Sequence, residues 1–129
     1  MDKGIRTPIE HVEEAIVAAD MAWWKLEFPS GALSFSENKT NMLGYNSKDF
    51  VHYTHFTDLI HPEDYDLSMD AMRDRYEGRK DIYDVIYRIK SADWIYVTFH
   101  NRGKIVERTD QGFIIAGIVQ KVADIWIRQ

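Results

Sequence analysis

The sequence contains no cysteine, which excludes disulfide bonds, thiolate metal sites and thiol nucleophiles. It has no run of about eighteen apolar residues, as a transmembrane helix requires, and its first residues lack the apolar core of a secretion signal. Its 16 basic residues are outnumbered by 21 acidic ones and do not cluster, which argues against binding to nucleic acid. We therefore expect a cytoplasmic segment that makes no membrane contact and has no nucleic-acid partner.

The residues that are present indicate a single packed domain. The chain has 129 residues, of which 45% are hydrophobic and 13% aromatic, which is enough for one core. No internal repeat and no low-complexity stretch interrupts it. The pattern of apolar residues can therefore be taken as that of one fold.

A first helix is predicted over residues 7–20. Thr7 and Glu10 have the spacing of a capping box, and Pro8 suits the first helical position. The apolar residues of this helix recur every three or four positions and share one face. They are Ile9, Val12, Ile16 and Ala19. This face has two interpretations: it packs on the sheet of its own chain, or it pairs with the same helix of a second subunit.

Alternation with a period of two predicts the strands. It marks residues 21–28 and 32–35 as a hairpin, 82–89 as a further strand and 113–119 as the last one. Strand-like residues also occupy 94–99 and 104–108, separated by residues 100–103. Helices at 38–43, 46–51 and 62–78 fill the middle. This order predicts an α+β fold, in which a five-stranded antiparallel sheet carries helices on one face.

The long helix begins within residues 56–66. Pro62 has no backbone N–H and a fixed φ, which suits a first helical turn. Glu63 and Asp64 place negative charge at the positive end of the helix dipole, and His61 is expected to cap or pack in the turn. The carboxylates of this helix fit a solvated face: Glu63, Asp64, Asp66, Asp70 and Asp74. We predict no catalytic residue and no metal site.

Several motifs resemble those of the PAS family of sensory domains. Residues 58–64, Asp-Leu-Ile-His-Pro-Glu-Asp, are similar to its "IHPxD" signature, and residues 42–45, Met-Leu-Gly-Tyr, to its Leu-Gly-Tyr. The hairpin at 24–31 and the segments 87–89 and 102–108 are similar to its strands. The resemblance implies a PAS domain over residues 21–121. A capping or dimerisation helix over residues 1–20 would precede it, and a linker to an output domain would begin over residues 122–129.

The sequence departs from the family in three places, one of which is spacing: the segment 94–102 is longer, and the interval from 111–112 to Gly117 shorter, than is usual. Members usually carry Asp-Gly in the turn before a tryptophan-bearing strand, where this chain has Ala92-Asp93-Trp94. Many also have Asp-Ile-Thr four residues beyond a glycine of the last strand, a motif that helps to couple the sheet to a signalling helix. Counted from Gly117, this chain has Lys121-Val122-Ala123. A basic residue therefore replaces the acidic one, with an effect on signalling that the sequence leaves open.

The resemblance implies a cavity between helices and sheet. We predict its lining to be Tyr45, Phe50, Phe56, Ile60, Met69, Met72, Tyr87 and Phe99. All eight can equally form a filled core without a ligand. Covalent flavin photochemistry and a thioester-linked chromophore both need a cysteine and are excluded. Haem is not expected, because the long helix has no histidine after its start, whereas non-covalent flavin or a small organic ligand fits an apolar pocket.

The implied function is that of a sensory, non-catalytic module of a larger signalling protein. Its output domain in cis would be a histidine kinase of a two-component system or a GGDEF diguanylate cyclase. The alternative is a protein–protein interaction module with a filled core, which forms a homodimer through Ile9, Val12 and Ile16. The identity of the ligand, the output domain, the direction of signalling and any membrane anchor of the parent protein are left open.

Overall fold

Residues 7–123 are described by a computed structural model, in which all strands join one sheet. In chain order the strands are β1 (Met21–Phe28), β2 (Leu33–Phe35), β3 (Tyr83–Lys90), β4 (Tyr96–Arg108) and β5 (Phe113–Val122). The helices are α1 (Pro8–Ala18), α2 (Asn38–Asn41), the 3-10 turn η1 (Ser47–Asp49), α3 (Tyr53–Thr57) and α4 (Pro62–Tyr76). The predicted five-stranded antiparallel sheet is confirmed, with the strand order β2-β1-β5-β4-β3.

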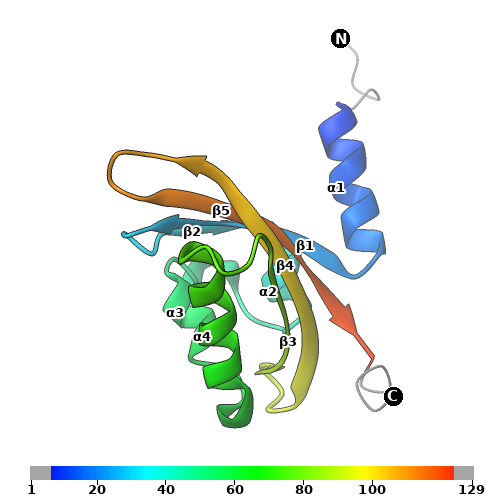
Figure 1. Cartoon of the computed structure of the whole chain (residues 1–129). Helices are drawn as coiled ribbons and strands as arrows, with labels where there is room; N and C mark the ends of the chain where they lie inside the picture. Colours follow the sequence, from blue (N-terminus) through cyan, green and yellow to red (C-terminus); the bar gives the residue numbers. More distant parts are fainter. Residues whose placement is uncertain (1–6, 124–129) are drawn as a thin grey trace.

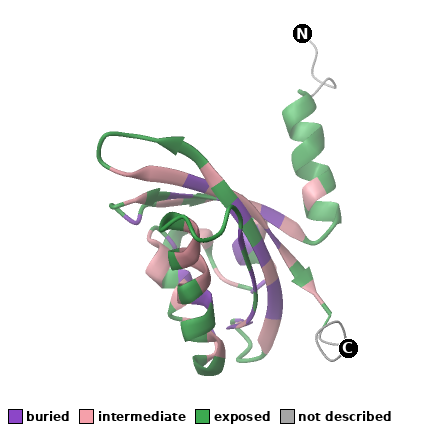
Figure 2. Ribbon diagram, viewed as in Figure 1, coloured by how far each residue is buried: buried purple, intermediate pink, exposed green. Residues whose placement is uncertain are grey.

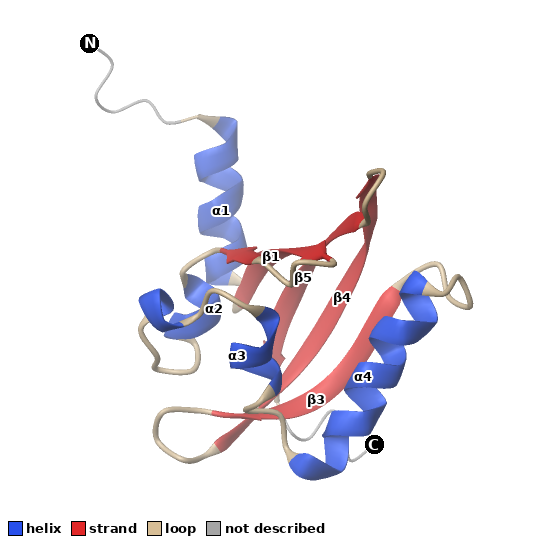
Figure 3. Cartoon of the chain, turned by 90° about the vertical axis from the view of Figure 1, so that its left-hand side faces the viewer, coloured by secondary structure: helices blue, strands red, loops and turns tan. Residues whose placement is uncertain are grey.

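Alternating side chains give the sheet one buried face. In β3 every second residue from Tyr83 to Ile89 is buried, and in β1 Trp24 and Leu26 are buried between more exposed neighbours. Helices α2, α3 and α4 cover this face, whereas α1 stands on the other side of the sheet (Figure 1, Figure 3). The core therefore lies between the sheet and these three helices, and Figure 2 shows the buried segments there.

The stretch predicted to separate two strand segments belongs to one continuous strand, β4. Its side chains keep alternating: His100 and Arg102 lie on the outer face, where both contact Asp84, while Asn101 and Gly103 are buried. The predicted interruption is wrong because polar side chains and glycine occupy both faces here. Apolar alternation disappears although the backbone continues as a strand.

Helix α1 carries the predicted apolar stripe but does not bury it. The capping box at Thr7 and Glu10 is present, and the helix has no buried residue. Ile16 is half-buried beside the outer face of β1, whereas Ile9 and Val12 are 69% and 57% exposed. The interpretation that the stripe packs on the sheet of its own chain is therefore wrong for most of its length.

Helix α4 begins at Pro62, as predicted, and its start is tied to β3. The backbone N–H of His61 donates to the carbonyl of Arg88 at 2.8 Å, and His61 Nδ1 accepts the N–H of Glu63 at 3.0 Å, which caps the helix. Asp64 does not belong to a solvated face, because its side chain is 16% exposed and pairs with Arg88. That prediction is wrong for Asp64. Within residues 7–123, no helix is both long enough and apolar enough to cross a membrane.

Candidate functional site

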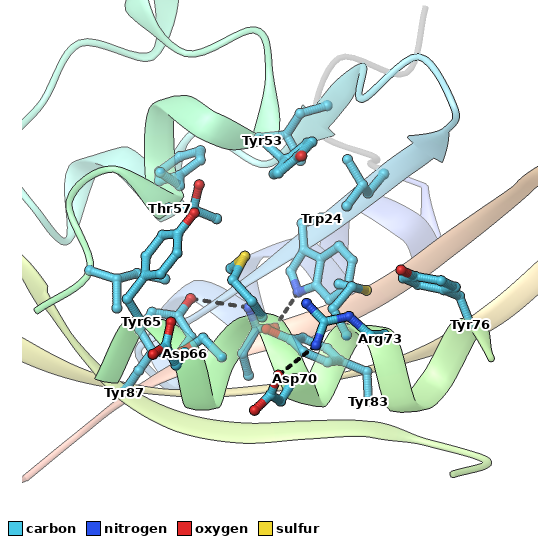
Figure 4. A pocket seen from close by; sticks show the side chains of 18 of the residues that line it. Trp24, Tyr53, Thr57, Tyr65, Asp66, Asp70, Arg73, Tyr76, Tyr83 and Tyr87 are labelled. Carbon is cyan, nitrogen blue, oxygen red and sulfur yellow. Dashed lines mark hydrogen bonds and ion pairs between the residues drawn. The ribbon is translucent and has the colours of Figure 1, made fainter. Parts of the chain in front are cut away.

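A pocket of about 460 Å³ opens between α4, α3 and the buried face of the sheet (Figure 4). Strands β1, β3 and β4 supply its floor, α2 and α3 contribute one wall, and α4 forms the other. Aromatic and aliphatic side chains dominate the lining. The volume lies within the range of roughly 300–1,000 Å³ that small-molecule sites occupy.

Trp24 forms the centre of the floor. Gly103 and Gly117 face each other across β4 and β5 beneath its indole, and a Cβ at these positions would lie 2.8 and 2.6 Å from the ring. The indole Nε1 donates to Asn101 Oδ1 at 2.6 Å, and the Asn101 amide donates to the Tyr87 hydroxyl at 3.2 Å. Burial raises the pKa of Tyr87 to about 12, so the hydroxyl stays protonated at neutral pH. These bonds hold the floor in one orientation.

The wall formed by α4 uses the predicted apolar face of that helix. Four side chains at helical spacing lie along it: Tyr65, Met69, Met72 and Tyr76. Tyr65 and Tyr76, towards the two ends of the helix, are 40% and 43% exposed and stand on either side of Trp24 in Figure 4. Asp70 and Arg73 form an ion pair of 2.6 Å at the exposed rim. The pocket is therefore apolar inside and charged at its edge.

Five of the eight residues predicted to line a cavity are brought together in this pocket. They are Phe56, Ile60, Met69, Met72 and Tyr87. The other three lie in the core beside it. Phe99 is fully buried in β4, the Phe50 ring packs 4.4 Å from that of Phe56, and Tyr45 donates its hydroxyl to the carbonyl of Lys90 at 2.8 Å. These three side chains support the walls from behind.

Lys39 of α2 also lines the pocket and was not predicted to do so. Its side chain is buried, and its Nζ lies 3.6 Å from the centre of the Phe56 ring and 5.9 Å from that of Phe35. Burial lowers the pKa of Lys39 to about 7. No sequence signal distinguishes this lysine from a surface residue, because its burial depends on aromatic rings that are distant in the chain. The sequence does carry a signal for Asn101: continuing the alternation of side chains along β4 predicts that it points into the core.

Three histidines cap the starts of α3 and α4. His52 Nδ1 and His61 Nδ1 each accept a backbone N–H two residues further on, at the starts of α3 and α4. His55 Nδ1 accepts the backbone N–H of His52 at 3.2 Å. In the part of the chain that the structure describes, the pocket lining contains none of these three side chains. The polar groups that this lining offers a ligand are therefore not imidazoles.

Comparison with known proteins identifies the family. The family model for the PAS fold matches residues 32–119, more than half of the chain. The chain belongs to this family. The resemblance found in the sequence motifs is thereby confirmed, and a comparison with curated proteins found no match.

Solved structures share the fold of this PAS domain. A sensory box histidine kinase/response regulator from Burkholderia thailandensis is 22% identical, with a TM-score of 0.73 over 92% of this chain and 88% of the other. The N-terminal domain of a diguanylate cyclase with PAS/PAC sensor from Marinobacter aquaeolei is 16% identical, with a TM-score of 0.69 over 78% and 94%. A PAS domain from Colwellia psychrerythraea is 12% identical, with a TM-score of 0.67 over 90% and 98%.

The departure at the end of the last strand has a defined place in this PAS domain. Lys121 lies in β5 opposite Phe99, and its backbone N–H donates to the carbonyl of Asp20 at 2.9 Å. Its side chain is exposed. Lys121 therefore stands where the last strand meets the corner between α1 and β1. The predicted linker over 122–129 lies outside the described residues from position 124 onwards.

Proposed function

We propose that this PAS domain is a sensory module that binds a small organic molecule in the pocket beside α4. Its occupancy would be transmitted to a histidine kinase or diguanylate cyclase domain of the same protein, the output classes named for two proteins of similar fold. The pocket carries the proposal, because it combines about 460 Å³ of space with aromatic and thioether walls. Such sites bind mostly apolar ligands and orient them with few polar groups.

The attachment of α4 supports a response to binding. The start of the helix is fixed to β3 through Asp64 and Arg88, whereas Met69 and Met72, further along, contact the pocket. A thioether side chain adapts its shape easily, so a ligand that fills the pocket can move the middle of α4 while its start stays in place. The floor offers a second route, since Trp24 lies on β1, which pairs with β5 and leads to Lys121.

Ligand-dependent thermal unfolding tests the proposal. A ligand that binds only the folded state stabilises it by about 2.7 kcal/mol at one hundred times its Kd, which raises the melting temperature by several degrees. Met72→Trp fills the pocket, whereas Leu67→Trp adds the same ring to the same helix at a side chain that is 58% exposed and outside the lining. We expect a screen of small organic molecules to yield shifts in wild type and Leu67→Trp but not in Met72→Trp. A broad screen without any shift in wild type would contradict the proposal.

A second proposed function is homodimerisation through α1. It is favoured by the exposure of Ile9 and Val12, which with Ile16 and the outer-face Trp23 border a shallow apolar groove. Val12→Glu places a charge in this stripe without disturbing the core, and His11→Glu adds the same charge beside it. We expect light scattering to give a dimer for wild type and His11→Glu and a monomer for Val12→Glu. A monomeric wild type at high concentration would end this proposal.

A further inference from the structure

The pocket contains one cation without an anionic partner. Lys39 is 5% exposed, and within residues 7–123 no carboxylate oxygen lies within ion-pair distance of its Nζ. The other cation of the lining, Arg73, differs from it: its guanidinium is exposed at the rim and is paired with Asp70 at 2.6 Å. Buried lysines are rare unless they are paired, because the ammonium loses its hydration. Lys39 therefore stands out as a charge for which the described part of the fold supplies only aromatic rings.

The ammonium group of Lys39 lies beside the pocket. Its Nζ lies 3.6 Å from the centre of the Phe56 ring, and Phe56 itself belongs to the lining. The face of an aromatic ring attracts a cation only modestly, by roughly 0.5–2 kcal/mol, which does not replace a lost hydration shell. A ligand oxygen in the pocket would supply the missing hydrogen-bond acceptor.

We infer that the ligand of this domain carries a carboxylate, which pairs with Lys39 Nζ while an aromatic body lies against Trp24. This inference rests on the proposed function of the pocket. The charge of one ammonium matches one carboxylate, whereas a phosphate is usually held by several donors or by a guanidinium fork. Among the described residues the lining supplies no such set, because its second cation, Arg73, is already paired.

The walls favour an aromatic body. Trp24 presents its indole on the floor, and tyrosines from three different elements surround it: Tyr53, Tyr76, Tyr83 and Tyr87. Tyr83 already packs edge-on against Trp24, with ring centres 5.9 Å apart, in the geometry that aromatic pairs prefer. A planar ligand ring can continue this arrangement.

Other charged groups line the pocket only at its rim. Asp66, Asp70 and Arg73 are exposed on α4, where water and salt screen their effect on an anion inside. Burial raises the pKa of Tyr83 and of Tyr87 on the floor, so these two hydroxyls carry no charge at neutral pH. Lys39 is thus the group whose charge decides between an anionic ligand and its neutral analogue.

Matched pairs of probes test this inference. Indole-3-acetate is compared with indole-3-acetamide, and phenylacetate with phenylacetamide, by calorimetric titration of the 129-residue chain at pH 6.5. We expect the acid of at least one pair to bind wild type at least about ten-fold more tightly than its amide. Lys39→Met should abolish this preference and leave the affinity for the amide unchanged. Lys48→Met, which removes an exposed lysine outside the lining, should keep it.

A measurement on wild type alone keeps the test independent of the folding of Lys39→Met. The pKa of Lys39, followed by NMR of its side chain, should rise when the acid binds and stay unchanged with the amide. Equal binding of acid and amide to wild type, or no rise of this pKa, would contradict the inference that the ligand carries a carboxylate. It would not contradict the proposal that the pocket binds a ligand. If no probe binds wild type, the inference fails, whereas the proposed pocket function fails only if the broad screen of small organic molecules also gives no shift.

Discussion

Asp64 and Arg88 join the first turn of α4 to the middle of β3 through a two-pronged ion pair. Arg88 Nε and Nη2 each donate to an Asp64 carboxylate oxygen at 2.8 Å, and the Arg88 backbone N–H donates to Oδ2 at the same distance. The hydrogen bonds from Arg88 lower the pKa of Asp64 against the opposing effect of its burial. This pair fixes the end of the wall that borders the pocket.

Asp64→Asn should destabilise the domain by about 1–3 kcal/mol, because it leaves Arg88 with a neutral partner. Since the pKa of Asp64 is lower in the folded state than its usual 3.8, the carboxylate stabilises the fold above about pH 4. This contribution is lost as the pH falls through the folded pKa. Urea unfolding at pH 3–7 should therefore show the difference from wild type shrinking below pH 4. Asp66→Asn, the same change at an exposed residue two positions further along α4, is the control, and an equal loss there would contradict the role of the pair.

Lys39 should make stability depend on pH in the neutral and alkaline range. Its pKa is about 7 in the fold against 10.5 in an exposed lysine, so between these values the unfolded chain binds more protons. The free energy of unfolding therefore rises with pH above 7, while below 7 the penalty of the buried charge is fully present. Lys39→Met should stabilise the domain by about 1–4 kcal/mol at pH 6, and this gain should decrease towards pH 9. Thermal unfolding checks this, and curves of wild type and variant that stay parallel over pH 6–9 would refute it.

The sequence predicted those parts of the fold that depend on local rules. The start of α4 at Pro62 follows from the missing N–H of proline, and the buried face of β3 follows from the alternation after Tyr83. The apolar face of α4 was also correct, because Met69 and Met72 share one side of any helix at their spacing. The four-residue α2 and the single turn η1 were predicted longer than they are.

The features that the sequence did not reveal depend on distant partners. Asp64 has the composition of a solvated helix face, and only Arg88, 24 residues further on, brings it into an ion pair. Lys39 lies in a polar segment, and its burial arises from Phe35 and Phe56. Asn101 has the sequence context of a loop residue, and its inward position becomes clear from the hydrogen bond that it accepts from the indole N–H of Trp24. The polar residues of the site were therefore not predicted from the sequence, whereas some of its apolar residues were.

The turn before β4 places a residue with a large side chain, Trp94, at positive φ. Trp94 has a φ of 66° and a side chain that is 80% exposed, and the Lys90 ammonium lies 4.8 Å from its ring centre. Positive φ is unfavourable for a residue with a Cβ by about 1–2 kcal/mol, which offsets the entropy that glycine loses on folding. Trp94→Gly should change the free energy of unfolding by less than about 0.5 kcal/mol. Ile95→Gly, at the next exposed residue, should lower it by about 1 kcal/mol, and equal losses would show that Trp94 is not strained.

The glycine pair beneath Trp24 should be intolerant of a methyl group. A Cβ at Gly103 would lie 2.8 Å from both the indole and the carbonyl oxygen of Ala116, so Gly103→Ala must displace the floor of the pocket. We expect a destabilisation of about 1–3 kcal/mol in urea unfolding, although alanine restricts the unfolded chain and opposes this loss. Lys104→Ala, on the exposed side of β4, should change stability by less than about 0.5 kcal/mol. In a Trp24→Phe background the smaller ring relieves part of the clash, so the loss from Gly103→Ala should decrease. An undiminished loss in that background would assign the whole effect to the backbone of β5 rather than to the indole.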